Sequence, residues 1–201
     1  MTEKIQLGVL CSGRGSNFER IVKAARSREI PSAEVVLCLA DRPAPVQELS
    51  ETLGVECLLV EPKNYPDQLA WTRAMVLELK KRNVELIVLA GFLRKIEKPL
   101  LEAYPQRILN IHPALLPSFG GPGMYGLKVH EAVLASGAKE SGVTIHVVDE
   151  VYDHGPVILQ EKVPVLEGDT PETLQGRVLE LEHRLYPRAI AKMLKSIEQI
   201  S

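Results

Sequence analysis

Apolar positions along this chain alternate between short strand-like runs and longer stretches with helical spacing. Continuous apolar runs bounded by turn residues predict strands at residues 5–10, 35–39, 57–60, 86–90 and 107–112. Apolar residues spaced three and four apart predict helices between them, at residues 18–28, 47–53, 66–82 and 99–104. Strands that alternate with helices are typical of βαβ units around a parallel sheet.

The pattern changes after residue 112. A loop rich in glycine and proline covers residues 117–126, and its length is typical of lids and binding loops. A helix is predicted at 130–136, followed by strands at 143–148 and 157–165 with a polar loop between them.

The last part of the chain is predicted to hold two helices. A capping residue followed by proline at 169–172 predicts the start of a helix that runs to about residue 185. Pro187 is expected to interrupt it, and a final helix is predicted at 189–197.

These elements predict one α/β domain over residues 1–201. We expect a Rossmann-like, three-layer arrangement around a mostly parallel sheet with antiparallel C-terminal strands. Residues 1–105 are expected to form a phosphate-binding half, and residues 106–201 a catalytic half.

The composition narrows the classes of partner. A net charge of -2 and 4% aromatic residues provide neither the positive charge nor the stacking surfaces that nucleic-acid binding requires. Cys11, Cys38 and Cys57 form no Cys-x-x-Cys pair and lie in or beside apolar runs, which is typical of buried thiols in a reducing compartment. No apolar run reaches bilayer length and no signal peptide is visible, so we expect a cytoplasmic protein without a membrane partner.

Asn110 and His112 are the first candidates for chemistry. They lie two residues apart in a predicted strand, so their side chains face the same side of the sheet. Pro113 has no backbone N–H and ends the strand there. An amide donor and a titratable imidazole therefore lie at a strand end, where open α/β sheets bind ligands. The alternative is a buried strand with two hydrogen-bonded polar side chains.

The turn after the first predicted strand, residues 11–17, is a candidate phosphate site. Gly13 and Gly15 allow the backbone to approach a ligand closely, and the following helix offers unpaired N–H groups at its N-terminus. Ser16 and Asn17 can add side-chain donors or cap the helix. A single phosphate monoester fits this turn best.

Two alternatives remain for the same turn. The dinucleotide fingerprint is incomplete because Phe18 stands at its third glycine position, although Asp41 at the end of the second strand keeps a NAD site open. A helix cap without a ligand is the other alternative.

Asp153 lies in the loop after the strand that carries Thr144 and His146 on one face. A carboxylate within about 4–6 Å of an imidazole favours the charged ring, so Asp153 is expected to raise the pKa of His112 and keep it protonated. By itself, an acid in an acidic loop is more often solvated than catalytic.

Metal binding and serine chemistry are weaker alternatives. The histidines and acids match no compact ligand motif, so we expect no metal, and the chain has no G-x-S-x-G elbow. His130 and His183 fall in predicted helices and are interpreted as structural or surface residues.

Several segments together resemble the folate-dependent glycinamide ribonucleotide formyltransferases. They are residues 12–17 (SGRGSN), 88–94 (VLAGFLR), 109–117 (LNIHPALLP) and 153–160 (DHGPVILQ), and Glu182-His183 before Tyr186-Pro187 also fits. The resemblance implies the formyltransferase fold, with the folate site in the half formed by residues 106–201.

The resemblance also implies a role for individual residues. Asn110, His112 and Asp153 are the implied catalytic residues. The implied ribonucleotide-binding residues are Gly15, Ser16, Asn17, Leu179, Glu180, Leu181 and Glu182. The implied folate-binding residues are Leu93, Arg94, Lys95, Ile96, Asn110, Asp149, Glu150, Val151, Tyr152 and Asp153.

The reaction that the resemblance implies belongs to purine biosynthesis. The formyl group of 10-formyltetrahydrofolate, the co-substrate, passes to the amine of glycinamide ribonucleotide by direct attack, without a metal. The partners are small molecules, and the protein is expected to be a monomer or homodimer. Alternatives are a formyltetrahydrofolate hydrolase, which should carry an additional regulatory domain, and a non-catalytic nucleotide-binding module.

Three departures from the family pattern affect these expectations. The loop at 120–127 is longer than in compact members, so the lid is expected to close differently. Gln68 stands where many relatives have an arginine near the folate, and Thr144 stands where some have serine.

Overall fold

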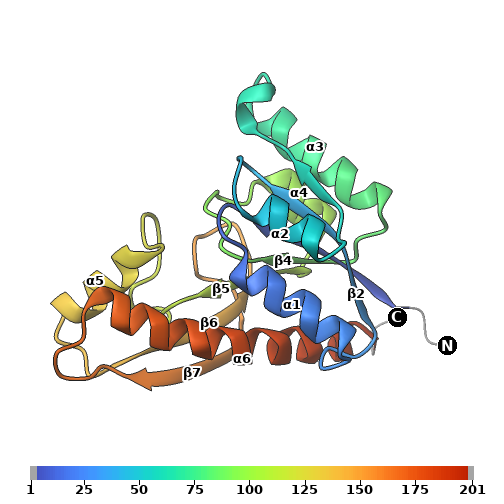
Figure 1. Ribbon diagram of the computed structural model, residues 1–201. Helices are drawn as coiled ribbons and strands as arrows, with labels where there is room; N and C mark the ends of the chain where they lie inside the picture. Colours follow the sequence, from blue (N-terminus) through green and yellow to red (C-terminus); the bar gives the residue numbers. More distant parts are fainter. Residues whose placement is uncertain (1–3, 199–201) are drawn as a thin grey trace.

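The computed structural model describes residues 4–198 and places its strands in a single seven-stranded sheet (Figure 1). The strands are β1 (Ile5–Cys11), β2 (Ala33–Ala40), β3 (Cys57–Leu59), β4 (Leu86–Leu89), β5 (Ile108–His112), β6 (Glu140–Val147) and β7 (Val157–Pro164). Their order is β3-β2-β1-β4-β5-β6-β7. β1 to β5 pair in parallel, whereas β6 and β7 are antiparallel, as predicted.

Helices cover both faces of the sheet, as Figure 1 shows. One apolar cluster packs α1, α2 and α6 against the sheet, and a second packs α3 and α4 against its other face. The helices are α1 (Ser16–Arg26), α2 (Val46–Thr52), the short 3-10 helix η1 (Pro62–Asn64), α3 (Gln68–Lys81), α4 (Lys98–Ala103), α5 (Leu127–Ala135) and α6 (Pro171–Glu198).

Neighbouring residues of the central strands alternate between these two clusters. Val9 of β1 and Val88 of β4 face α1 and α6, whereas Leu10 and Leu89 face α3 and α4. Strands covered on both faces consist of apolar residues throughout. This is why continuous apolar runs in the sequence predicted them. The predicted three-layer arrangement is confirmed.

The strand order reverses between β1 and β4. From β1 the chain moves outward through β2 to β3, then returns to β4 and continues through β5 on the other side. β1 and β4 lie side by side in parallel, with Leu10 opposite Leu89. Such a reversal leaves a crevice at the carboxyl ends of the strands. The loops that follow β1 and β4 therefore begin at the same place.

α6 is one continuous helix, and the prediction that Pro187 interrupts it is wrong. A proline inside a helix costs about 3 kcal/mol, because one backbone hydrogen bond is lost and the preceding turn is crowded. Leu185 and Tyr186 before the proline and Ala189 and Ile190 after it are all buried in the same apolar cluster. Burial of a large apolar side chain contributes about 1.5–3 kcal/mol, so packing on both sides of Pro187 offsets the cost.

Other boundaries differ from the prediction by a few residues. α1 begins at Ser16 rather than residue 18, and β6 begins at Glu140 rather than residue 143. The predicted start of α6 is confirmed: Pro171 is its first residue, and Thr170 Oγ1 accepts a hydrogen bond from the backbone N–H of Thr173 at 3.3 Å.

The three cysteines are free. Cys11 and Cys38 are buried, as expected, whereas Cys57 is partly exposed on the edge strand β3, opposite Cys38 of β2. Within residues 4–198, no helix is both long and apolar enough to cross a membrane.

Tyr186 ties α6 to the two strands that end at the crevice. Its buried hydroxyl group has two carbonyl oxygens as hydrogen-bond acceptors, that of Leu89 at 2.8 Å and that of Leu109 at 3.2 Å. We expect Tyr186→Phe to lower the free energy of unfolding by about 1–2 kcal/mol, because this donor is lost. Urea unfolding measures the change.

Tyr104→Phe is the matched control for this measurement. The Tyr104 hydroxyl is also buried but has no hydrogen-bond partner within the described part of the chain. Its removal is expected to change the free energy of unfolding by less than about 0.5 kcal/mol. Equal losses in the two variants would contradict the stabilising role of the Tyr186 hydroxyl.

Candidate active site

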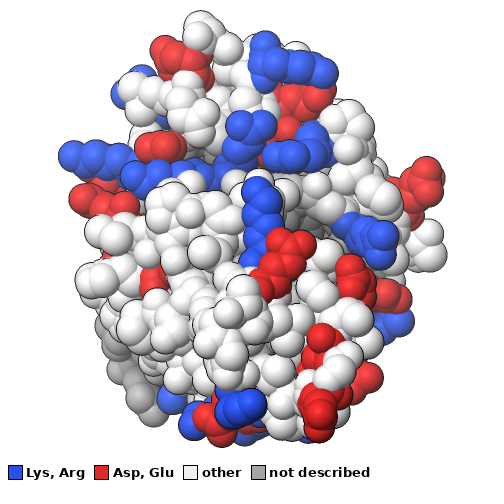
Figure 2. All heavy atoms as spheres, turned by 90° about the vertical axis from the view of Figure 1, so that its left-hand side faces the viewer, with Lys and Arg blue, Asp and Glu red and all other residues white. Residues whose placement is uncertain are grey.

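A cavity of about 660 Å³ lies at the carboxyl ends of β1, β4 and β5. Its walls come from the turn after β1, the loop after β4, the end of β5, the glycine-rich loop, the loop between β6 and β7, and one face of α6. A volume in this range is typical of sites for small molecules. Figure 2 views the left-hand side of Figure 1, where Lys and Arg side chains gather in a band across the middle and upper part of the surface.

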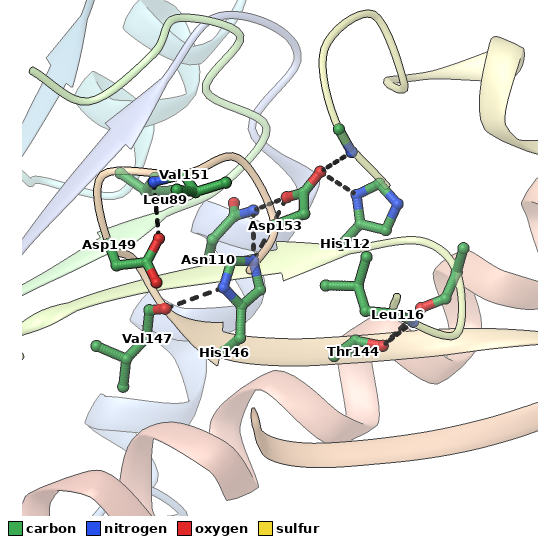
Figure 3. Close-up of polar contacts among 12 residues, drawn as sticks. Leu89, Asn110, His112, Leu116, Thr144, His146, Val147, Asp149, Val151 and Asp153 are labelled. Atoms are coloured by element: carbon green, nitrogen blue, oxygen red, sulfur yellow. Dashed lines mark hydrogen bonds and ion pairs between the residues drawn. The ribbon is translucent and has the colours of Figure 1, made fainter. Parts of the chain in front are cut away.

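Asn110 and His112 project from β5 on the same face, as predicted, and both line the cavity (Figure 3). Antiparallel pairing sets His146 of β6 opposite Asn110 and Thr144 opposite His112. Four polar side chains from two strands therefore lie together on one face of the sheet. The sequence alone assigned them to two separate strands and did not show that these strands pair.

Asp153 completes the predicted catalytic group. Its Oδ1 lies 3.4 Å from Asn110 Nδ2, and its Oδ2 lies 3.6 Å from His112 Nδ1. The backbone N–H of Gly121 donates to Oδ2 at 2.9 Å. Asp153 has a φ of 53°, in the left-handed region, and a non-glycine residue held there at a cluster of polar groups is typical of a functional site.

The charge of Asp153 is maintained by its hydrogen bonds. Burial acts to raise the pKa of this carboxyl group, but the interaction with His146 and the hydrogen bond from the Gly121 N–H outweigh burial and hold the pKa below its ordinary value. Asp153 is therefore ionised at neutral pH.

His112 is nearly buried, and its two ring nitrogens face different groups. Nε2 lies 2.8 Å from the carbonyl oxygen of Phe119, to which it donates, while Nδ1 faces Asp153. Burial lowers the pKa of His112, and this outweighs Asp153 and the Phe119 carbonyl, which act to raise it. Asp153 therefore acts in the predicted direction, but the expectation that it keeps His112 protonated is wrong, because desolvation of the charged ring is the larger effect.

His146 is a site residue that the sequence analysis did not select. Its Nδ1 donates to the carbonyl oxygen of Val147 at 3.0 Å, which leaves Nε2 to accept a hydrogen bond from Asn110 Nδ2 at 3.2 Å (Figure 3). The same Nε2 lies 3.5 Å from Asp153 Oδ1. Its alternation with Thr144 was the available signal, but only the strand register shows that it faces Asn110.

The turn after β1 has the geometry that a phosphate site requires. Gly15 caps α1 with a φ of 81°, and a Cβ atom at this position would lie 2.6 Å from Val46 Cγ2, so only glycine fits. Ser16 and Asn17 form the first turn of α1 and line the cavity with Gly15. The unpaired N–H groups of this helix end favour an anion.

Glu182 of α6 meets this turn from the other side. Asn17 Nδ2 donates to Glu182 Oε2 at 2.6 Å. Burial raises the pKa of Glu182 to about 7, although the hydrogen bond from Asn17 acts to lower it.

Only part of the predicted segment on α6 faces the cavity. Leu179 and Glu182 line it, as does Gln175, which the sequence analysis missed. Leu181 is instead buried in the apolar core, and Glu180 is exposed. Residues 175, 179 and 182 follow the spacing of one helix face, so the helical period was a signal that could have identified Gln175.

All the residues predicted to bind the folate line the cavity. They are Leu93, Arg94, Lys95, Ile96, Asn110, Asp149, Glu150, Val151, Tyr152 and Asp153. Gln68 is exposed at the start of α3 and does not line the cavity.

The alternatives for the turn after β1 find little support in the structure. Asp41 is buried and its carboxylate binds Arg42 and Arg94, so it does not point to a NAD ribose. Phe18 is buried in the core. Across residues 4–198, no group of three or more His, Cys, Asp or Glu side chains could hold a metal ion.

Comparisons with known proteins agree with this geometry. Residues 5–190 match a family model described as formyl transferase. The chain is 40% identical over 190 residues to the phosphoribosylglycinamide formyltransferase of Bacillus subtilis, and the aligned region covers 94% of both proteins. It is 42% identical over 186 residues to the chloroplastic phosphoribosylglycinamide formyltransferase of Arabidopsis thaliana, which covers 92% of this chain and 64% of that protein.

A crystal structure of glycinamide ribonucleotide transformylase 1 from Symbiobacterium toebii has the same fold. Its TM-score is 0.89 at 42% identity, over 95% of this chain and 88% of that one. This chain, an α/β protein with a cavity at a topological switch point, belongs to the formyl transferase family. The relatives named here are phosphoribosylglycinamide formyltransferases, also called glycinamide ribonucleotide transformylases. The family and fold predicted from the sequence are confirmed.

His130 of α5 provides a test of the electrostatics of this region. It is buried, and its Nδ1 has no hydrogen-bond partner among the described residues. Burial lowers its pKa from 6.5 to about 4, and the neighbouring His112 acts in the same direction.

We expect His130→Gln to flatten the acid dependence of stability. The native ring stays neutral to about pH 4, whereas the unfolded chain takes up this proton near pH 6.5. The unfolded state therefore binds more protons in this window, and stability falls as the pH drops from 6.5 toward 4. Melting temperatures of the wild type and the variant over that window give the two slopes. Identical slopes would show that His130 is not buried as a neutral ring.

Proposed function

We propose that this protein transfers the formyl group of 10-formyltetrahydrofolate to the amine of glycinamide ribonucleotide, a step of purine biosynthesis. One observation carries the proposal: Asn110, His112 and Asp153 meet in a cavity whose other walls include an anion-binding helix end. The relatives at about 40% identity carry the name of this activity. Both substrates are small molecules, and we propose that the protein works in the cytoplasm, where its thiols stay free.

The ribonucleotide is assigned to the wall formed by α1 and α6. Its phosphate binds the backbone N–H groups and side chains of Gly15, Ser16 and Asn17 at the start of α1. Glu182 lies beside Asn17 and accepts hydrogen bonds from the ribose hydroxyl groups. The amine then points toward the end of β5.

The folate is assigned to the opposite wall. Its pterin ring lies between residues 93–96 and the loop at 149–153, where the exposed apolar side chains of Leu93, Val151 and Tyr152 provide contact area. Asp149 stabilises this loop, because its two carboxylate oxygens accept hydrogen bonds from the Val151 N–H at 2.8 Å and from His154 Nδ1 at 2.9 Å.

The chemical step is a direct attack of the amine on the formyl carbon. As the carbon becomes tetrahedral, negative charge develops on the formyl oxygen, and Asn110 Nδ2 and a ring N–H of His112 donate to it. His112 Nε2 is held by the Phe119 carbonyl at 2.8 Å, so the formyl oxygen replaces that carbonyl as acceptor. Asp153 faces Nδ1 and stabilises the positive charge that the ring gains when it takes up a proton there. The tetrahedral intermediate then collapses: the bond between the formyl carbon and folate N10 breaks, and the proton lost by the amine passes to N10 through water or His112.

Incubation with 10-formyltetrahydrofolate, with and without glycinamide ribonucleotide, tests the proposal. Tetrahydrofolate formed only when the amine is present identifies a transferase. Tetrahydrofolate formed without the amine identifies a hydrolase, and no conversion identifies a binding module. In the active protein, we expect His112→Ala and Asp153→Asn each to lower kcat by about 100-fold or more. Calorimetric affinity for the ribonucleotide should stay within about threefold, and normal turnover by either variant would refute the assigned roles.

The ribonucleotide site is tested separately by Ser16→Ala. We expect this variant to raise the KM for the ribonucleotide by about fivefold, because one neutral side-chain donor to the phosphate is lost. The KM for 10-formyltetrahydrofolate and kcat should stay within about twofold. Equal increases in both KM values would mean that the phosphate site is misplaced.

A further inference from the structure

Asp41 is a buried carboxylate that the reaction described above does not use. It follows β2 directly, and its side chain is 0% exposed. Arg42 Nη2 donates to Oδ2 at 2.8 Å, and Arg94 Nε donates to the same oxygen at 3.0 Å. Burying a charge without a partner is strongly unfavourable. These two hydrogen bonds compensate the loss of water and allow Asp41 to be buried in ionised form.

The pKa of Asp41 reflects the same arrangement. Burial acts to raise it, but the hydrogen bonds from Arg42, Ser12 and Arg94 outweigh burial and keep the pKa below its ordinary value. The carboxylate is therefore charged at neutral pH and able to bind two guanidinium groups.

One of the groups bound to Asp41, Arg94, belongs to the walls of the cavity. Arg94 lies in the segment 93–96 assigned to the folate, and its side chain is 42% exposed. Its Nε is held by Asp41, whereas its Nη1 and Nη2 have no hydrogen-bond partner among the residues that the structure describes. The guanidinium group is thus fixed at one nitrogen and open at the other two.

Ser12 provides the second connection. Its hydroxyl group interacts with the Asp41 carboxylate, whose pKa it lowers, and accepts a hydrogen bond from the backbone N–H of Leu93 at 3.0 Å. Ser12 also donates its own backbone N–H to the carbonyl oxygen of Gly91 at 3.1 Å. Ser12 is the first residue after β1, at the start of the turn assigned to the phosphate, so one carboxylate connects that turn to both the backbone and the side chain of the folate segment.

We propose that Asp41 is a positioning residue that holds Leu93 and Arg94 in the orientation required to bind the folate. This inference rests on the proposed function, since it assigns a role within the folate site. Asp41 itself touches neither substrate. It acts through Arg94 Nε and through the Ser12 hydroxyl, and it keeps the folate segment in a set place relative to the phosphate-binding turn.

If the Asp41 charge acted only through the electrostatic potential, its removal would strengthen substrate binding. Both substrates are anionic, and the surface around Asp41 carries Arg42 and Arg94. Loss of a carboxylate next to these cations makes the local potential more positive, so both substrates would bind more tightly. Positioning predicts weaker binding of the folate alone. The direction of the change therefore separates the two explanations.

The test is steady-state kinetics of Asp41→Asn after turnover by the wild-type protein has been established. We expect the KM for 10-formyltetrahydrofolate to rise about tenfold, because charge-assisted hydrogen bonds that orient Arg94 and Ser12 are weakened. The KM for the ribonucleotide and kcat should stay within about threefold. Calorimetric titration with tetrahydrofolate, the product, should show the same loss of affinity without turnover.

Asp169→Asn is the matched control. Asp169 also has a nearly buried carboxylate, at 4% exposure, which binds Arg177 at 2.7 Å, and it does not line the cavity. Its substitution should leave both KM values within about twofold while lowering the melting temperature. If Asp41→Asn does not fold, Ser12→Ala removes the hydroxyl group between Asp41 and Leu93 while both arginines stay bound to Asp41, and it is expected to raise the folate KM by about threefold to tenfold.

The possible results are distinguishable. An increase in the folate KM in Asp41→Asn or Ser12→Ala, absent in Asp169→Asn, supports the positioning role. A lower folate KM, parallel increases in both KM values, or the same increase in Asp169→Asn would overturn it. A wild-type protein that binds tetrahydrofolate but transfers no formyl group would contradict the proposed function and leave the binding comparison valid.

Discussion

Hydrogen bonds between β5 and β6 hold Asn110 opposite His146 and His112 opposite Thr144. Because side chains in a strand alternate between faces, a shift of this register by one residue would turn these polar groups away from one another. The register also determines where the loop after β6 returns to the sheet, and thus where Asp153 meets Asn110 and His112 (Figure 3). The candidate active site therefore depends on one antiparallel pair at the side of a parallel sheet.

Burial shifts the pKa values of the titratable groups around the cavity in different directions. The imidazoles of His112 and His130 lose water without gaining enough compensation, so the pKa of each is lowered. Burial also raises the pKa of Glu182, which has one hydrogen-bond donor in Asn17. Asp153 keeps its charge because several donors surround it. In each case, the direction of the pKa shift follows from the balance between burial and the interactions of the charged form.

The two cavity walls assigned to the substrates come from segments that are distant in sequence but follow neighbouring strands. The turn after β1 and the loop after β4 begin side by side because β1 and β4 are neighbours. Asp41, at the end of β2, connects these two segments through Ser12 and Arg94. On the other side of the cavity, His146 plays a comparable part for Asn110. In both places a buried side chain fixes a neighbour that faces the cavity.

Local patterns in the sequence were sufficient for the elements and for much of the site. Apolar runs and helical spacing predicted the parallel strands and most helices, because burial on both faces leaves a direct trace in composition. The glycines after β1 and the alternation of Asn110 with His112 marked two cavity walls in advance. The residues that the family resemblance assigned to the folate all line the cavity, because most of them belong to two continuous loop segments, 93–96 and 149–153.

Tertiary structure determined the features that depend on contacts between residues far apart in the chain. Pro187 is accommodated because the residues around it are buried against the sheet, which no local rule for proline includes. The net pKa of His112 follows from its desolvation, and desolvation depends on the fold as a whole. Likewise, Leu181 faces the core while Glu182 faces the cavity. The sequence by itself determined the elements and the chemistry available, because these are local properties; register, burial and long-range contacts determined how that chemistry is arranged.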